Sequence, residues 1–121
     1  HFADSDGAGH SFGWGSKEQV KAFEDEDSAL QLILDGIERA GILKDSVIIL
    51  TADHGGHGKT HGSSSPEDMN IPWIAWGTGV TKGAPLTGVN TCDTAATALW
   101  LLGVKVPQSF DGKPVTTAFK K

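Results

Sequence analysis

The sequence contains only one cysteine, Cys92, among 121 residues. A single cysteine excludes an internal disulfide, and it leaves the redox compartment undetermined because secreted proteins need not contain disulfides. No run of about 18 apolar residues occurs, so we expect no membrane span. Basic residues are also few, since 10 Lys and Arg stand against 15 Asp and Glu and the net charge is -5. Without a basic stripe, we expect no binding of bulk nucleic acid.

The chain also begins without an initiator methionine or a signal peptide. A dense polar stretch that contains Asp4 and Asp6 follows almost at once. The length fits one domain of ordinary size and is too short for two. We therefore expect residues 1–121 to be a single segment that continues a longer protein.

Two adjoining patterns predict a helix followed by a buried strand. Ser16 and Gln19 form a capping box ahead of apolar residues spaced mostly three, four and seven apart, which predicts a helix over residues 17–40. Residues 46–51 are a short β-branched apolar run, typical of a strand buried on both faces in a parallel sheet. A helix followed by such a strand indicates an α/β fold.

The rest of the chain adds few elements. We expect a strand over residues 70–77, a helix over residues 93–102 and an edge strand at residues 115–117. A strand as apolar as residues 47–50 needs cover on both faces and neighbours on both edges. Because this chain supplies few such neighbours, the pattern favours part of a larger α/β domain.

Candidate metal ligands follow two predicted strand ends. The first pair is four residues apart in a glycine-rich stretch after a possible strand end at residues 1–3, and the others follow the strand of residues 46–51. Ligands of parallel α/β sheets gather at the carboxyl ends of strands, so we expect these side chains to meet there. The five residues are Asp6, His10, Asp53, His54 and His61.

The chemistry of this set indicates a transition-metal site. Imidazole mixed with carboxylate suits zinc, manganese or iron better than calcium. Five such ligands exceed the three protein ligands of a typical catalytic zinc, which favours two ions of the kind that clamp the entering and leaving oxygens in phosphoryl transfer. Each motif alone is weak, and a turn residue beside an exposed histidine is the alternative interpretation of Asp53 and His54.

The motifs in order resemble a known superfamily. Residues 51–56 (Thr-Ala-Asp-His-Gly-Gly), together with Asp6-x-x-x-His10 upstream and His61-Gly62 downstream, resemble the C-terminal half of the alkaline phosphatase superfamily. The nearest branch is that of type I phosphodiesterases and nucleotide pyrophosphatases. Later segments match its final strand, helix and tail in the same order. The resemblance implies an α/β fold in which this chain is the C-terminal portion of a three-layer α/β/α sandwich with a mostly parallel sheet.

The resemblance also implies two divalent metal ions, with zinc favoured and manganese as the alternative. One ion would be held by Asp6, His10 and His61. The second would take Asp53 and His54, and in relatives it also takes an upstream aspartate and the nucleophile itself. In the resembling enzymes a serine or threonine at a helix N-terminus attacks phosphorus, and water later opens the covalent intermediate.

No residue of this chain matches that nucleophile. The serines at positions 63–65 lie in a loop and lack the strand-turn-helix setting, so we expect the nucleophile, and the N-terminal half that carries it, upstream of residue 1. His57 is expected to be a loop or supporting histidine rather than a ligand. Trp14 and Lys59 are candidates for contact with the substrate, against the alternatives of a packed tryptophan and a solvated lysine.

We therefore expect the intact protein to be a metal-dependent phosphoric ester hydrolase of the phosphodiesterase, nucleotide pyrophosphatase or phosphatase type, acting on a small phosphate ester. A sulfatase or a metal-dependent phosphoglycerate mutase of the same superfamily is the nearest alternative. A different class is a catalytically inactive metal-binding fragment, which would hold one ion tightly and lose it when His10 is replaced by alanine. A third possibility is a homo-oligomer formed through an exposed sheet edge. Resemblance alone favours a periplasmic or secreted location.

Overall fold

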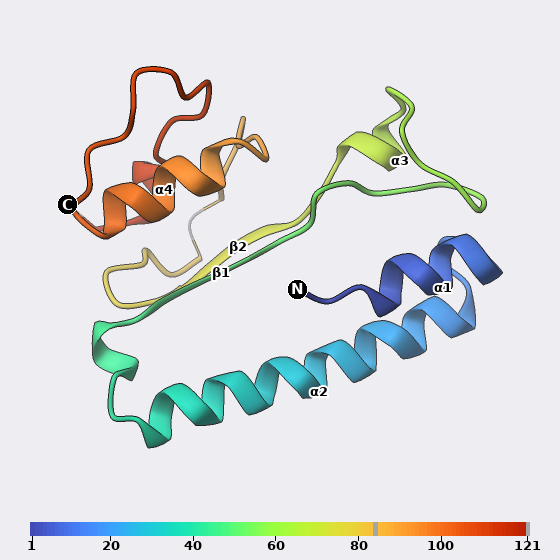
Figure 1. The fold of residues 1–121 in the computed structure, drawn as a ribbon, viewed down its shortest axis with the longest axis horizontal. Helices are drawn as coiled ribbons and strands as arrows, with labels where there is room; N and C mark the ends of the chain where they lie inside the picture. Colours follow the sequence, from blue (N-terminus) through green and yellow to red (C-terminus); the bar gives the residue numbers. More distant parts are fainter. Residues whose placement is uncertain (84, 121) are drawn as a thin grey trace. The chain divides into compact units, whose positions relative to one another are not determined.

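The structure is a computed structural model that describes residues 1–83 and 85–120. The chain divides into two compact units (Figure 1). Residues 1–43 and 53–71 form the first unit, and residues 44–52 and 72–121 form the second. All five expected metal ligands therefore belong to the first unit. No helix among the described residues is long and apolar enough to cross a bilayer.

The first unit contains three helices, α1 (Asp4–Phe12), α2 (Lys17–Arg39) and the short α3 (Pro66–Met69). Helix α1 lies beside the N-terminal part of α2 (Figure 1). The backbone N–H of Ser5 donates to Glu26 Oε1 over 2.9 Å, and Gln19 Nε2 donates to the Ser5 carbonyl over 3.1 Å. These two contacts fix the start of α1 against α2.

Helix α2 confirms the helix predicted from the capping box and the apolar spacing. Ser16 Oγ accepts the Gln19 N–H at 3.2 Å, and Gln19 Oε1 accepts the Gly15 N–H at 2.7 Å. Gln19 is only 4% exposed, so this cap is packed as well as hydrogen-bonded. Gly41, with φ of 70°, follows the last turn in the left-handed conformation that favours glycine.

Helix α1 corrects the prediction for the start of the chain. Residues 1–3 form no strand, and the stretch from Asp6 to His10 lies on a helix rather than in a glycine-rich loop. Gly9 serves close packing: a Cβ atom on it would lie 2.9 Å from Gln19 Nε2 and from the Trp14 ring. Packing against neighbouring residues therefore outweighs the low helix propensity of glycine.

The second unit contains a two-stranded sheet of β1 (Val47–Thr51) and β2 (Trp73–Gly77), with helix α4 (Asp93–Leu101). Short 3-10 helices cover Leu43–Asp45, at the junction of the two units, and Thr116–Ala118. Both strands and α4 confirm the predicted elements, with one end of each shifted by one to three residues. The described residues thus form a mixed α/β structure.

The strand pairing differs from the pattern that the β1 sequence favoured. β1 and β2 run antiparallel, with Val47 opposite Gly77 and Thr51 opposite Trp73. A continuous apolar run reports burial on both faces, and all five β1 residues are half-buried. It carries no information about the direction of any one neighbouring strand, so the mostly parallel sheet expected for the larger domain stays a prediction.

The core of the second unit lies at its C-terminal end, where Val115, Ala118 and Phe119 are buried. The predicted edge strand at residues 115–117 is wrong. The Val115 N–H donates to Thr97 Oγ1 over 2.9 Å, and the chain then turns into the 3-10 helix. Thr97 of α4 therefore accepts the hydrogen bond of a backbone N–H that strand pairing would have used.

Candidate metal centre

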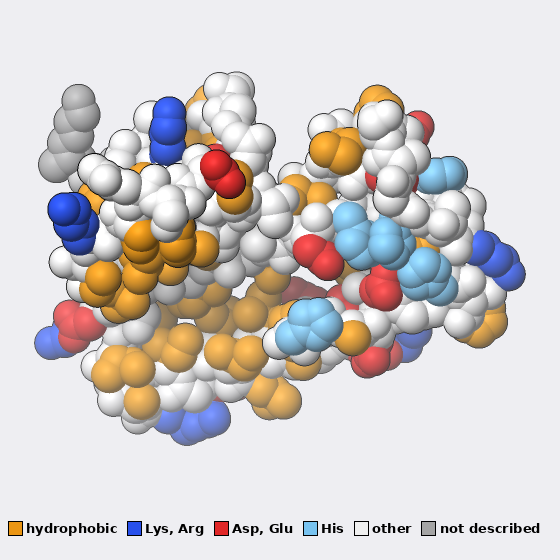
Figure 2. All heavy atoms as spheres, turned by 45° about the horizontal axis from the view of Figure 1, so that its top comes forward, with side chains coloured by type: hydrophobic (Ala, Val, Ile, Leu, Met, Phe, Trp, Pro, Cys, Tyr) orange, Lys and Arg blue, Asp and Glu red, His pale blue; other side chains and the backbone are white. Residues whose placement is uncertain are grey.

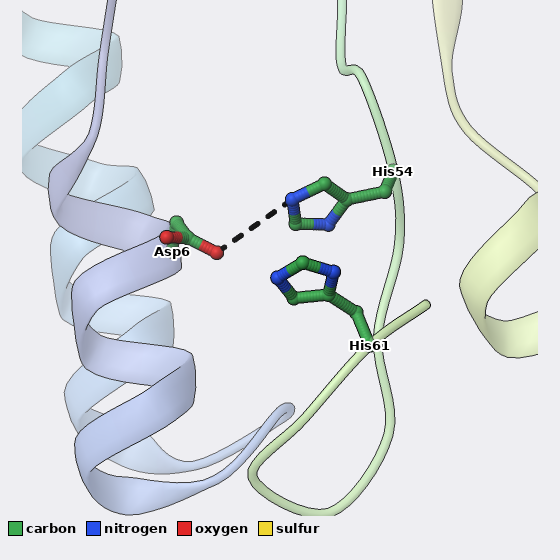
Figure 3. Close-up of side chains that lie close together, drawn as sticks. All are labelled: Asp6, His54 and His61. Atoms are coloured by element: carbon green, nitrogen blue, oxygen red, sulfur yellow. Dashed lines mark ion pairs between the residues drawn. The ribbon is translucent and has the colours of Figure 1, made fainter. Parts of the chain in front are cut away.

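Three donor side chains of the first unit come together at one point. Asp6 projects from α1 toward the loop that follows β1, where His54 and His61 lie side by side (Figure 3). One ligand atom from each residue lies within 4.8 Å of the other two. The imidazole rings of His54 and His61 stack with centroids 3.6 Å apart and planes 15° from parallel. Figure 2 shows histidine side chains gathered with acidic side chains on the surface.

The other two predicted ligands lie next to this trio. His10 Nε2 is 3.5 Å from Asp6 Oδ1, because residues four apart share one face of helix α1. His54 Nε2 lies 3.9 Å from Asp6 Oδ1 and 3.7 Å from Asp53 Oδ2. The rings of His10 and His61 are 5.0 Å apart. The structure therefore brings all five residues into one cluster, with Asp6 between His10 and His54.

Backbone carbonyls set the orientation of two of the imidazoles. His10 Nδ1 is 3.1 Å from the Lys59 carbonyl, and His54 Nδ1 is 2.8 Å from the Gly55 carbonyl. A carbonyl can only accept, so each Nδ1 donates, and in the neutral imidazole Nε2 then has the lone pair. In both residues the free Nε2 is the atom nearest Asp6. This is the support that metal-binding histidines usually have.

The ligands differ in exposure. The Asp53 side chain is 83% exposed, whereas that of His54 is 27% exposed. Asp6 and His10 are about half exposed. The cluster is thus open to solvent on the Asp53 side and shielded around His54.

The glycine pair after His54 permits two close contacts. A Cβ atom on Gly55 would lie 2.0 Å from the carbonyl oxygen of Glu67, and the Gly55 N–H donates to the Asp68 carbonyl over 2.7 Å. A Cβ atom on Gly56 would lie 2.1 Å from Cε2 of Trp14. Only glycine fits at either position, so the pair allows the ligand loop to lie against α3 and Trp14.

Trp14 contacts two of the histidines, His10 and His61. Its ring meets His10 edge-on at 5.1 Å and His61 at 5.9 Å. The indole also lies against the backbone of Gly9 and Gly56. Because the ring is held between α1 and the ligand loop, Trp14 supports the position of two imidazoles. Its predicted contact with a substrate stays a prediction.

Lys59, the other candidate for substrate contact, reaches the end of α1. Its Nζ donates to the Ser11 carbonyl over 2.7 Å. The positive charge at the C-terminal turn of a helix is favourable for the helix dipole. The residue therefore has a local role, and its contact with a substrate also stays a prediction.

Asp68 of α3 also belongs to this region, although no sequence pattern predicts it. Asp68 is 3% exposed, and its Oδ1 accepts from His57 Nδ1 at 2.7 Å. The hydrogen bond from His57 lowers the pKa of Asp68 to about 2, and the same bond raises the pKa of His57. The two residues are 11 positions apart in an irregular loop, where no periodic signal links them. His57 is thus bound to a carboxylate and is not a member of the ligand trio.

The serines at positions 63–65 stay outside the cluster. Ser63 and Ser64 are exposed, and Ser65 immediately precedes α3. The N–H of Ser65 donates to Ser63 Oγ over 3.1 Å. Their local contacts order the start of a four-residue helix.

The donors fit a transition-metal ion. Two ligands at about 2.0 to 2.1 Å from a tetrahedral zinc ion lie about 3.4 Å apart. The separations of Asp6 Oδ1 from the Nε2 atoms of His10 and His54 are 3.5 and 3.9 Å, so small side-chain movements would bring each pair to that spacing. The mixture of imidazole and carboxylate suits zinc or manganese.

Comparison with known proteins gives a consistent set of relatives. The sequence model of the type I phosphodiesterase / nucleotide pyrophosphatase family matches residues 1–65. A GPI ethanolamine phosphate transferase 1 from Chaetomium globosum is 34% identical over 83 residues, covering 68% of this chain and 9% of the relative. An extracellular sulfatase SULF-1 homolog from Drosophila melanogaster is 28% identical over 104 residues, or 80% of this chain and 9% of the relative.

A 2,3-bisphosphoglycerate-independent phosphoglycerate mutase from Methylobacillus flagellatus is 29% identical over 119 residues, or 93% of this chain and 22% of the relative. No solved structure matches the chain. The chain thus spans between 9% and 22% of the length of these three relatives.

The matches and the histidine and carboxylate cluster define the class as the alkaline phosphatase superfamily, which contains enzymes of phosphoryl and sulfuryl transfer that generally use divalent metals. Within it, the chain belongs to the type I phosphodiesterase / nucleotide pyrophosphatase family. The resemblance inferred from the ordered motifs is therefore confirmed.

Proposed function

We propose that the intact protein is a metal-dependent phosphoric ester hydrolase and that this chain supplies most of a two-metal site. The observation that carries the proposal is the convergence of Asp6, His54 and His61, whose ligand atoms lie within 4.8 Å of one another. His10 and Asp53 extend this trio on either side. Five donors are more than one catalytic zinc requires, which supports two ions.

The chain's own residues would hold and orient the ions. Bound divalent ions stabilise charge on the entering and leaving oxygens of a phosphoryl transfer. Asp6 supplies a carboxylate whose Oδ1 lies within 3.9 Å of the Nε2 atoms of both His10 and His54. The carbonyls of Lys59 and Gly55 keep the protons of these imidazoles on Nδ1. Each Nε2 is then ready to bind without a change of tautomer.

The remaining catalytic residues would lie outside this chain. The nucleophile and the other ligands of the second ion would come from an N-terminal half of the domain, because the serines near the site lie in a loop. In the intact protein, β1 would belong to a mostly parallel sheet within a three-layer α/β/α sandwich. Residues 1–121 would then be the C-terminal segment of that domain.

A phosphotransferase is the second candidate. The observation in its favour is that a relative named GPI ethanolamine phosphate transferase 1 is 34% identical over 83 residues. The two reactions differ in whether water or an alcohol takes the phosphoryl group. Sulfate-ester hydrolysis and the mutase reaction remain further alternatives, because relatives with those names also match.

The test uses the full-length protein with its upstream residues and Zn²⁺ or Mn²⁺. A nitrophenyl phosphodiester should be hydrolysed, and a chelator or His61→Ala should abolish turnover. Asp111→Asn, an exposed carboxylate of the second unit, is the control and should leave turnover unchanged. Addition of an alcohol distinguishes the candidates, because a transferase forms a new phosphodiester with it. Turnover of a sulfate ester alone would contradict the proposal.

An inactive metal-binding role makes a different prediction for the 121-residue chain by itself. It requires at most one tight zinc site, which His10→Ala should abolish. Two tight sites, or turnover of the phosphodiester by this chain alone, would contradict that role. Calorimetric titration with zinc measures the number of sites directly.

A further inference from the structure

Asp68 is a buried carboxylate that three segments of the ligand loop contact. Its Oδ1 accepts from His57 Nδ1 and its Oδ2 accepts from the Ser63 N–H, both at 2.7 Å. Its backbone carbonyl accepts from the Gly55 N–H, also at 2.7 Å. At 3% exposure the carboxylate receives little help from solvent. These hydrogen bonds compensate the cost of burying it.

The three contact points lie close to the metal ligands along the chain. Gly55 directly follows His54, His57 lies inside the loop, and Ser63 is two residues beyond His61. One residue of α3 therefore holds both ends and the middle of the segment that carries two ligands of the trio.

The middle of the loop is also tied to α1. His57 and Thr60 exchange backbone hydrogen bonds of 3.0 Å, which closes a tight hairpin. The tip of this hairpin contacts α1 and its end: the Gly58 carbonyl accepts from the Trp14 N–H at 2.7 Å, and the Lys59 carbonyl faces His10. A shift of His57 would therefore move the carbonyl that orients His10.

We infer that Asp68 and His57 are positioning residues for the metal centre, forming a clasp that keeps the His54–His61 loop in its metal-binding shape. The inference rests on the proposed function, since it assigns the clasp to the metal cluster described above. Neither residue binds the ion: Asp68 is buried beneath the loop, and the Nδ1 of His57 is occupied by Asp68.

The charges of the pair favour a closed clasp at neutral pH. The hydrogen bond from His57 holds the pKa of Asp68 near 2, and Asp68 raises the pKa of His57. The carboxylate is therefore ionised and accepts on both oxygens. A neutral amide at position 68 offers one accepting oxygen in place of two, so either His57 or Ser63 would lose its partner.

The test measures metal binding by the 121-residue chain with Zn²⁺ and Co²⁺. Asp68→Asn and His57→Ala should each weaken zinc binding by about 10-fold, the lower end of the effect of residues that support metal ligands. His57→Asn should restore most of the affinity, because the asparagine amide can donate from about the place of Nδ1. Glu67→Gln, which removes the adjacent exposed carboxylate, is the matched control and should bind zinc as the wild type does.

The visible absorption of bound Co²⁺ separates positioning from general destabilisation. Asp68→Asn and His57→Ala should change the Co²⁺ spectrum, because a displaced loop alters the coordination. Circular dichroism checks that each variant is folded. If Asp68→Asn does not fold, the two His57 variants complete the test, since His57 itself is half exposed and Asp68 keeps the hydrogen bond from the Ser63 N–H in both.

The outcomes distinguish the clasp from the proposed function. Wild-type affinity and an unchanged Co²⁺ spectrum in Asp68→Asn and His57→Ala would overturn the clasp and leave the metal centre intact. Weaker binding that His57→Asn does not restore would also overturn it. If the wild-type chain takes up neither ion, the proposed metal centre fails, and the assignment of the clasp fails with it.

Discussion

Replacing Gly56 with alanine would drive a Cβ atom into the Trp14 ring. The new atom would lie 2.1 Å from Cε2 and 2.5 Å from both Cδ2 and Nε1 of Trp14, where ordinary contacts are about 3.5 to 4.0 Å. The φ of Gly56 is not in the left-handed region, so backbone strain adds nothing. The whole effect must come from displacement of the indole.

The indole has little room to yield. It also lies against Gly9, where a Cβ atom would be 2.9 Å from Cδ2 and Cε3 of the ring. We therefore expect Gly56→Ala to destabilise the protein by about 1 to 3 kcal/mol, the usual cost of overpacking. Because the ring also contacts His10 and His61, zinc affinity should fall by about 10-fold.

Urea unfolding followed by circular dichroism measures the first effect, and calorimetric titration with Zn²⁺ measures the second. Gly7→Ala is the matched control, since it makes the same chemical change on α1 with nothing within 4 Å of the new atom. It should stabilise the helix by about 0.5 to 1 kcal/mol. In a Trp14→Ala background, Gly56→Ala should cost far less, as expected when two residues interact directly. Unchanged stability and zinc affinity in the single Gly56 variant would refute the reasoning.

Three further predictions concern stability, each measured by urea unfolding. Gly36→Ala should raise the free energy of unfolding by about 1 kcal/mol, because Gly36 lies inside α2 with nothing within 4 Å of its Cβ position; an unchanged value would contradict this. Thr97→Val should lower it by about 1 to 3 kcal/mol, because the buried Val115 N–H loses its acceptor; a neutral result would show that another acceptor replaces Oγ1. The folded state lowers the pKa of Asp68 to about 2, so the stability advantage over Asp68→Asn should be full above about pH 4 and decline toward pH 2; an advantage that grows on acidification would contradict it.

The elements that the sequence predicted well are those set by local signals. The cap at Ser16 and the apolar spacing define α2 almost to the residue, since both signals lie within the helix itself. The β-branched run likewise located β1. Such patterns specify an element before any tertiary contact forms.

Other features depended on contacts with distant residues. The glycines of α1 indicate a loop until Gly9 is seen against Trp14 and Gln19. The antiparallel direction of β2 relative to β1 is not encoded in an apolar run. In α1, tertiary packing outweighs the local preference.

Part of the candidate site could likewise be predicted from the sequence, and part of it could not. Asp6 and His10 were recognised by their spacing. The prediction of a loop was wrong, but the pair still lies together because residues four apart share one face of a helix. The ordered motifs identified the family, which the comparison with known proteins confirms. Asp68 had no such signal, because its link to His57 exists only after α3 folds against the loop.

The central claim is that the cluster around Asp6 binds a divalent metal ion. Calorimetric titration of the 121-residue chain with Zn²⁺, repeated with Asp6→Ala and with His61→Ala, tests it most directly. We expect tight zinc binding by the wild type and a loss of affinity of more than about 10-fold in each variant. This loss is larger than the one expected when a residue that only supports a metal ligand is removed. Absence of zinc uptake by the wild type, or equal affinity in all three proteins, would contradict the account.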